Sequence, residues 1–251
     1  MIKPTCVFFL LFCIYSTSAS DKKQLDIYTE HLPPFQIQKD QQVTGFATDI
    51  IKEIMLLAEL DYQIKIYPWT RSFNMAKSKD NACIYSIGRT SARESLFHWI
   101  GIIATTHTSF VSLRTRQDII VNSINDAKKY RVAVLRDDAT HKMLLDAGFI
   151  ENHNLFVVNN THSLLKLLTQ RQSIDLIMAD PLTVKHRAIY DKLDPSSFIA
   201  QHNVNEQPMD FYLACNISTP DAIVESLKRA VEHLKSTGRF NAIIEEWGVN
   251  L

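Results

Sequence analysis

The chain has 251 residues, and its 27 lysines and arginines balance its 27 aspartates and glutamates, so the formal net charge is zero. A chain without a net basic field has no general attraction for nucleic acid or anionic lipid, and neither is expected as a partner. About 230 residues remain after the first twenty, enough to bury one large core or two smaller ones.

The first twenty residues predict a secretory signal peptide. Lys3 gives a short basic start, and the unbroken apolar run 6–15 (CVFFLLFCIY) follows it. The small residues 16–20 come next and place the expected cleavage near Ala19 or Ser20. An apolar run of about ten residues is too short to span a bilayer. The alternative, a buried N-terminal helix, is disfavoured because nothing amphipathic continues the run. We therefore expect export from the cytoplasm.

Export decides how the cysteines are interpreted. A lipid anchor at Cys13 is not expected, because the preceding Phe12 is too bulky for the small residue that such a site needs. Cys83 and Cys215 remain in the mature chain, and an oxidising compartment permits a disulfide between them. Both lie in apolar, strand-like runs, so two small buried thiols are an equally good interpretation. The sequence leaves both open.

Strand and helix patterns alternate along the remaining chain, which is typical of an α/β protein. The apolar spacing predicts strands at 25–29, 62–67, 82–87, 110–113, 131–135 and 174–178. Helical spacing and end signals predict helices at 49–60, 140–147, 163–170 and 221–237, a short helix after a capping box at 123–126, and a last helix ending at 247. No Gly/Ser-rich or Pro-rich linker is present, so strands must connect any two lobes.

Common catalytic and cofactor signatures are absent from the sequence. It contains no GxGxxG fingerprint, no phosphate-binding loop and no GxSxG elbow. None of its nine histidines forms an HxxxH pair or lies near a CxxC. We therefore expect no cofactor, no bound metal and no enzymatic activity.

The stretch 68–101 contains the candidate binding residues. A strand that ends in hydroxyl groups, a glycine and arginines is typical of a carboxylate receptor, because a guanidinium and the N–H groups at the next helix start both bind carboxylate oxygens. The alternative is an exposed turn whose arginines pair with Glu94 or Asp80. The residues concerned are Trp69, Arg71, Ser86, Gly88, Arg89, Thr90 and Arg93.

Four motifs follow one another along the mature chain: LPPF with GFATDIIKEI within 32–54, SIGRTSAR at 86–93, IDLIMAD at 174–180, and SLKRAVEHLKSTGRFNAIIEEWG at 226–248. Together they resemble the bacterial extracellular solute-binding protein family 3, the periplasmic amino-acid-binding proteins of ABC importers. The resemblance implies a periplasmic binding protein type II-like fold, with two α/β lobes joined by a two-strand hinge around a ligand cleft. The implied boundaries are 21–112 with 208–251 for lobe 1 and 113–207 for lobe 2.

The resemblance also implies roles for individual residues. Arg93 matches the arginine that holds the α-carboxylate of the ligand, with Ser86 and Gly88 assisting. Asp180 matches the carboxylate of the other lobe that binds the α-ammonium group. The alternative for Asp180 is a helix cap before Pro181. A cation on one lobe and an anion on the other would bind the two ends of a zwitterion.

Two positions depart from the family pattern and leave the ligand open. Leu32 stands where the family often has an aromatic residue, and Glu30 and His31 are nearby candidates to line the cleft. Asp137 and Asp138 stand where the family has a Gly-Thr turn. These two acidic residues suit a helix start as caps, and if they face the cleft a cationic group on the ligand is expected.

Trp69 and Arg71 are candidates to compensate for these departures, with Trp69 as a stacking or cation–π face or, alternatively, as ordinary core. The resemblance implies a monomer that captures a small molecule by hinge closure and delivers it to an ABC permease or a membrane sensor. Two alternatives remain. One is an enzyme of the cyclohexadienyl dehydratase type, with Glu30 or Asp180 as the acid. The other is an interaction protein without a ligand.

Overall fold

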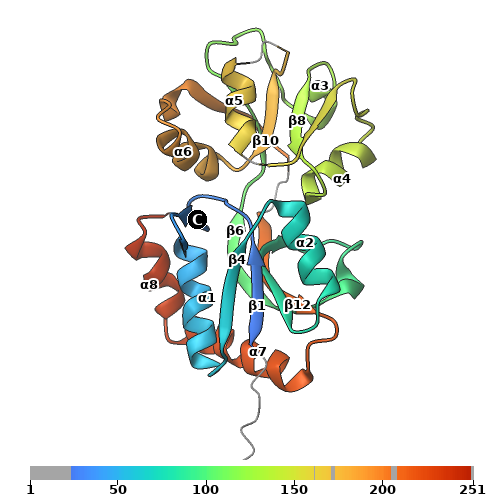
Figure 1. The fold of residues 1–251 in the computed structure, drawn as a ribbon. Helices are drawn as coiled ribbons and strands as arrows, with labels where there is room; N and C mark the ends of the chain where they lie inside the picture. Colours follow the sequence, from blue (N-terminus) through green and yellow to red (C-terminus); the bar gives the residue numbers. More distant parts are fainter. Residues whose placement is uncertain (1–23, 161, 171–172, 205–207, 250–251) are drawn as a thin grey trace, which may run out of the picture.

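The computed structural model describes residues 24–160, 162–170, 173–204 and 208–249, so the predicted signal peptide lies outside the described residues. The described chain forms two α/β lobes stacked end to end, each built on a five-stranded sheet (Figure 1). This confirms the predicted fold class. Within the described ranges, no helix combines the length and the apolar character needed to cross a bilayer.

Lobe 1 contains both ends of the described chain. Its sheet has the order β4 (Tyr62–Ile66), β1 (Leu25–Thr29), β5 (Ala82–Gly88), β12 (Met209–Asn216) and β6 (Phe97–Thr106). The first three strands are parallel, and β12 runs antiparallel to its neighbours. A small hairpin, β2 (Ile37–Lys39) and β3 (Gln42–Thr44), precedes the helices. These helices are α1 (Phe46–Leu57), α2 (Trp69–Ser78), α7 (Asp221–Ser236) and α8 (Arg239–Glu246).

The lobe 1 sheet is buried on both faces, and its side chains alternate between two cores. Ile27 packs in the core beneath α1, α7 and α8, whereas the adjacent Tyr28 packs in the core beneath α2. Successive side chains of a strand point to opposite faces of the sheet. When helices cover both faces, the side chains on each face must be apolar. All seven residues of β5 are buried for this reason.

Lobe 2 repeats this plan with shorter elements. Its sheet has the order β11 (Phe198–Asn203), β7 (Ser109–Leu113), β10 (Leu176–Ala179), β8 (Val132–Leu135) and β9 (Leu155–Val158), of which the last three are parallel. Its helices are α3 (Ile124–Ala127), α4 (Ala139–Asp146), α5 (His162–Gln170) and α6 (Pro181–Tyr190). Separate apolar cores fill the two faces of the sheet, one under α3 and α4 and the other under α5 and α6.

Two crossings connect the lobes. The chain leaves lobe 1 between β6 and β7 and returns between β11 and β12. The two crossings lie side by side, since the backbone N–H of Val204 donates to the carbonyl of Thr108 at 2.8 Å. β7 pairs with β10 and β11, so the chain enters lobe 2 at 107–108, ahead of the expected boundary at 112. β6 and β7 are separated by only two residues, so the sequence from 97 to 113 does not show where the lobe 1 sheet ends and the lobe 2 sheet begins.

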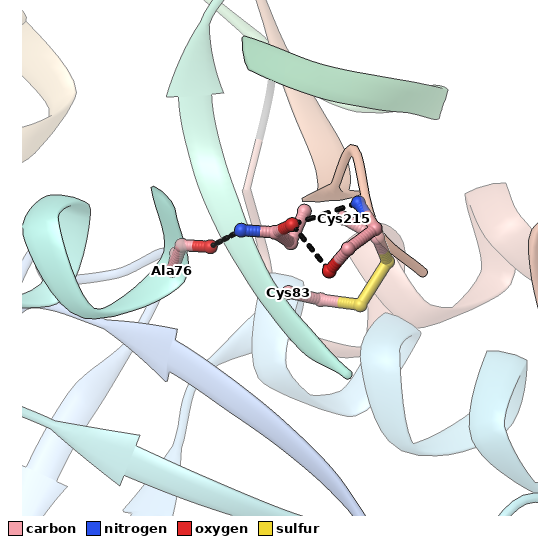
Figure 2. The surroundings of a disulfide bond; sticks show 5 residues. Ala76, Cys83 and Cys215 are labelled. Atoms are coloured by element: carbon pink, nitrogen blue, oxygen red, sulfur yellow. Dashed lines mark hydrogen bonds between the residues drawn. A yellow bond between two sulfur atoms is a disulfide. The ribbon is translucent and has the colours of Figure 1, made fainter. Parts of the chain in front are cut away.

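Cys83 and Cys215 form a disulfide. They face each other in register on the antiparallel strands β5 and β12, at the centre of the lobe 1 sheet, and both are fully buried. Next to the disulfide, the side chain of Asn216 donates a 3.0 Å hydrogen bond to the carbonyl of Ala76 on α2 (Figure 2). Of the two interpretations that the sequence leaves open, the structure shows the disulfide.

Candidate ligand-binding site

The carboxyl ends of parallel strands in both lobes point toward the space between the lobes. β1 is followed there by Glu30, β8 by Asp138 and β10 by Asp180, and Ser86 and Gly88 form the end of β5. In open α/β sheets, ligands bind outside the carboxyl ends of the strands. The topology therefore brings residues distant in sequence to one site.

These residues line a cavity of about 80 Å³ between the lobes. One water needs roughly 10–15 Å³ by this measure, so the cavity has room for a small molecule. Its charged lining comes from both lobes: Glu30, Arg93, Asp138, Asp180 and Arg187. Its walls are mostly apolar and include Leu32, Trp69, Leu135, Leu164, Leu165, Ile177, Met178, Val184, Met209 and Phe211.

Arg93 is a buried cavity residue and not part of an exposed turn. Its guanidinium lies 5.2 Å from the ring centroids of both Trp69 and Phe73. One terminal nitrogen donates to the carbonyl of Gly88 at 2.9 Å, and the other donates across the cleft to the carbonyl of Asp137 at 2.7 Å. Burial lowers the pKa of Arg93. A guanidinium has five N–H donors, so three remain for a ligand.

The turn at Asp137 and Asp138 in lobe 2 is hydrogen-bonded to side chains of lobe 1. Asp137 has a left-handed backbone (φ 58°), and its carbonyl accepts from the indole N–H of Trp69 at 3.0 Å as well as from Arg93. The carboxylate of Asp138 caps α4 by accepting from the N–H of Thr140 at 3.1 Å. Asp138 therefore faces the cavity and caps the helix at once, and Trp69 both lines the cavity and bridges the lobes.

Ser86 and Gly88 lie on the lobe 1 side of the cavity. Ser86 has a left-handed backbone (φ 58°), and its hydroxyl donates to the side-chain oxygen of Gln36 at 2.8 Å. A Cβ on Gly88 would lie 3.2 Å from the sulfur of Met209, so the absence of a side chain keeps this part of the cavity open. Both predicted residues are cavity residues.

Asp180 lies at the crossing between the lobes, at the start of α6. One carboxylate oxygen accepts from the N–H of Thr183 at 3.0 Å, and the other accepts from the hydroxyl of Thr106 and from the N–H of His107, the latter at 3.0 Å. Asp180 is thus the helix cap that the sequence offered as an alternative, and it also lines the cavity. A carboxylate has about four acceptor positions, so one remains for a ligand.

Glu30 of lobe 1 and Arg187 of lobe 2 also line the cavity. Glu30 is only 7 % exposed, and burial, together with the charge of Asp138, raises its pKa to about 8, against the opposing effect of Arg187. Arg187 is 3 % exposed, and burial lowers its pKa to about 10. Its guanidinium donates across the cleft to the carbonyl of His31 at 3.1 Å.

Two arginines of the 68–101 stretch lie outside the cavity. Arg71 is exposed on α2, with its guanidinium 4.0 Å from the centroid of the Tyr67 ring. Arg89 pairs with Glu94 through a 2.8 Å hydrogen bond, as the exposed-turn alternative expects. The structure therefore brings together seven of the eight predicted site residues and leaves out Arg71.

Arg187 is the charged cavity residue that the sequence reasoning missed. The helical period of α6 would have indicated that Arg187 is buried, because it lies on the same face as the other buried positions, Thr183, Val184 and Ala188. The helix begins with an Asp cap and a proline at its first position, which together predict a helix start. An arginine on the apolar face of that helix is a candidate for a buried, functional cation.

The family model for bacterial extracellular solute-binding proteins, family 3, matches residues 26–250. A sequence search among curated proteins finds no match.

Similar solved structures have the same two-lobed fold. A histidine kinase sensor domain with similarity to periplasmic binding proteins aligns over 90 % of this chain and 96 % of its own, with a TM-score of 0.79 and 14 % identity. The L-arginine-bound substrate-binding protein AbpA of an amino acid ABC transporter from Streptococcus pneumoniae aligns over 90 % and 94 %, with a TM-score of 0.74 and 18 % identity.

The arginine-, lysine-, histidine-binding protein ArtJ from Geobacillus stearothermophilus aligns over 91 % of this chain and 97 % of its own, with a TM-score of 0.74 and 16 % identity. At these identities the structures show a common fold, and the family follows from the sequence match over residues 26–250. The chain belongs to the bacterial extracellular solute-binding proteins, family 3.

Proposed function

We propose that the chain binds a small zwitterion, an amino acid or a close relative, in the cavity between its lobes. The observation that carries the proposal is that Arg93 of lobe 1 and Asp180 of lobe 2 line the same cavity and retain donor and acceptor capacity. A guanidinium binds a carboxylate through two parallel N–H groups, and a carboxylate accepts from an ammonium group. The two ends of a zwitterion would then be held by opposite lobes.

Binding of this kind would favour the closed state. A ligand that touches both lobes has more contacts when they are closed, so it shifts the population toward closure by that difference in affinity. A ligand that fills the cavity would displace water from between its mostly apolar walls, which would strengthen both charged contacts. We propose that a membrane partner, an ABC permease or a sensor, recognises the closed form. We also propose a periplasmic location, which the buried disulfide and the N-terminal sequence pattern support.

A thermal-shift screen of the mature protein against amino acids, polyamines and small organic acids tests the proposal. A ligand at 100 times its Kd adds about 2.7 kcal/mol of stability, which raises the melting temperature measurably. We expect Arg93→Ala to abolish the shift. We expect the same of Asp180→Asn, which keeps a helix-capping oxygen.

Two matched substitutions outside the cavity serve as controls. Arg71→Ala removes an arginine of the same stretch, and Asp194→Asn removes an aspartate that also caps a short helix. Both should leave the ligand-induced shift unchanged. A full shift in both Arg93→Ala and Asp180→Asn would refute the assignment of the binding groups.

One observation favours an enzyme as a second candidate. Glu30, whose pKa is raised to about 8, would keep its proton near neutral pH and could donate it to a leaving hydroxyl group. The oxygens of Asp180, by contrast, already accept three hydrogen bonds. Turnover of a prephenate-like acid by the purified protein, lost in Glu30→Gln, would favour the enzyme; binding without turnover favours the binding protein.

A further inference from the structure

One turn of lobe 2 accepts two hydrogen bonds from lobe 1 through a single carbonyl group. The carbonyl of Asp137 accepts from the guanidinium of Arg93 at 2.7 Å and from the indole N–H of Trp69 at 3.0 Å. Asp137 has a left-handed backbone (φ 58°), which costs free energy in a residue with a side chain. Such a conformation persists only where neighbouring groups hold it. Whatever holds this turn therefore also holds the acceptor that joins the lobes.

His141, in the first turn of α4, contacts the Asp137 turn from within lobe 2. Its Nδ1 accepts from the backbone N–H of Asp137 at 3.3 Å, and its Nε2 lies 3.1 Å from a carboxylate oxygen of Glu151. A backbone N–H can only donate, so Nδ1 must be unprotonated. The ring is then neutral with its proton on Nε2, which donates to Glu151. His141 is only 6 % exposed, and both of its ring nitrogens are engaged.

We propose that His141 is a positioning residue for ligand capture, an inference that rests on the proposed function. Its neutral imidazole holds the Asp137 turn in the conformation through which Arg93 and Trp69 contact lobe 2. Protonation at Nδ1 would place two N–H groups opposite each other, with their nitrogens 3.3 Å apart. The turn would then move, the closed state would lose its two contacts to the Asp137 carbonyl, and a ligand would bind less tightly.

Charged groups reach His141 and its turn from three parts of the molecule. They are Glu151 from the segment before β9, Asp137 and Asp138 at the start of α4, and Arg93 from lobe 1. β8, which packs against α4, consists of apolar residues. The Glu151 carboxylate can accept from the neutral imidazole and from the imidazolium, so this contact survives protonation. The contact to the N–H of Asp137 requires the neutral form, and it is the one that is linked to the cleft.

Ligand affinity should therefore depend on pH with a definite sign. The closed state holds the neutral imidazole, so uptake of a proton opposes closure. Affinity should be full above the range in which an imidazole ordinarily titrates, about pH 6.5, and should be lost as the pH falls through that range. From pH 7.5 to pH 5.5 we expect the contribution of His141 to lower the affinity by up to about tenfold.

The state of the imidazole can be measured without a ligand. Nitrogen NMR of the unliganded protein distinguishes the two neutral tautomers of a histidine from the imidazolium. We expect His141 to have its proton on Nε2 at pH 7.5 and to gain a second proton on Nδ1 toward pH 5.5, with a shift of the Asp137 amide signal over the same range. A proton on Nδ1 at pH 7.5, or an imidazole that keeps one form throughout, would overturn the inference.

Two substitutions of His141 separate its role in the turn from simple packing. The amide oxygen of asparagine can take the place of Nδ1 and does not titrate, so His141→Asn should hold the turn at both pH values and lose the pH dependence. The amide of glutamine reaches the place of Nε2 instead, so His141→Gln should keep the contact to Glu151 and lose the contact to Asp137. At pH 7.5, His141→Gln should bind about 2- to 10-fold less tightly than His141→Asn, the effect of one hydrogen bond.

The probes are the proteinogenic L-amino acids other than L-histidine, whose own imidazole titrates in this range. Thermal shift at pH 7.5 identifies those that bind, and isothermal titration calorimetry measures their affinity at pH 7.5 and pH 5.5. Other groups near the cavity, such as Glu30, titrate in the unmodified protein and in the variants alike, so the difference between them isolates His141. His233→Asn, on the exposed surface of α7, is the matched control and should keep the pH dependence of the unmodified protein.

The possible failures separate the inference from the proposed function. If amino acids bind but His141→Asn keeps the pH dependence of the unmodified protein, the inference is wrong and zwitterion binding stands. Equal affinities of His141→Asn and His141→Gln would also refute the inference, since His141 would then act through packing alone. If none of these amino acids binds at either pH, the proposed function fails, and the inference fails with it.

Discussion

The two lobes share one plan but are held together differently. Lobe 1 is assembled from two separate parts of the chain, and the disulfide between β5 and β12 joins those parts covalently. Lobe 2 is one continuous segment from β7 to β11, and its described residues contain no disulfide. The helices of lobe 1 reach 16 residues, whereas those of lobe 2 have 10 or fewer. Lobe 1 should therefore depend on oxidation and lobe 2 on core packing alone.

The lobes also contribute differently to the site. Lobe 1 provides the buried cation Arg93 and the buried acid Glu30, from a sheet in which the disulfide joins β5 and β12. Lobe 2 provides Asp138 and Asp180 at the starts of α4 and α6, where each carboxylate is oriented by backbone N–H groups. A ligand in the cavity would therefore lie between the strand ends of the lobe 1 sheet and two helix starts of lobe 2.

Removal of the disulfide should have the largest effect on the difference in stability between the two lobes. The Cys83→Ala, Cys215→Ala double variant reopens a loop that spans 132 residues, and the chain-entropy model gives a loss of roughly 4–5 kcal/mol in the free energy of unfolding. Urea unfolding measures that loss, and hydrogen exchange should show it first in β5 and β12. Equal loss of protection in both lobes would contradict the view that only lobe 1 depends on oxidation.

A core truncation in lobe 2 should have the next largest effect. Leu176 in β10 is fully buried, and Leu176→Ala should cost about 2–5 kcal/mol because a cavity replaces its side chain. Leu213→Ala in β12 is the matched change in lobe 1. Hydrogen exchange should show Leu176→Ala opening lobe 2 while lobe 1 stays protected. If lobe 1 opens to the same extent, the lobes are not separate cooperative units.

The smallest effect should come from a contact between the lobes. Trp69→Phe removes the indole N–H that donates to the carbonyl of Asp137, while Arg93 still donates to the same oxygen. The closed state should lose about 0.5–1.5 kcal/mol, so ligand affinity should fall by up to about tenfold. Calorimetry of ligand binding measures the change. A large fall in the melting temperature of the unliganded protein would instead assign Trp69 to the lobe 1 core.

Much of the lobe architecture was predictable from the sequence. Apolar alternation identified β1 and β4, and the end signals identified α7 with its closing Gly238. Helix α2 was not predicted, because the polar residues between its buried positions hide the helical period. The same period explains Arg71: Trp69, Ser72 and Ala76 face the core, and Arg71 lies between them on the exposed face.

The candidate site was predictable only in part. Motifs identified Arg93 and Asp180, because each follows a strand at a position where side chains reach the cleft. They did not identify Arg187, whose position in the cavity depends on its packing against the other lobe, a property of the tertiary structure. The disulfide was undecided for the same reason, since only strand register places Cys83 opposite Cys215.

The central claim is that one ligand is held by both lobes, and a crystal structure with the ligand of largest thermal shift tests it most directly. The account predicts the ligand in the cavity, its carboxylate about 2.7–3.2 Å from the guanidinium of Arg93 and its ammonium group at a similar distance from Asp180. A ligand bound outside the cavity, or inside it without contact to either residue, would contradict the account.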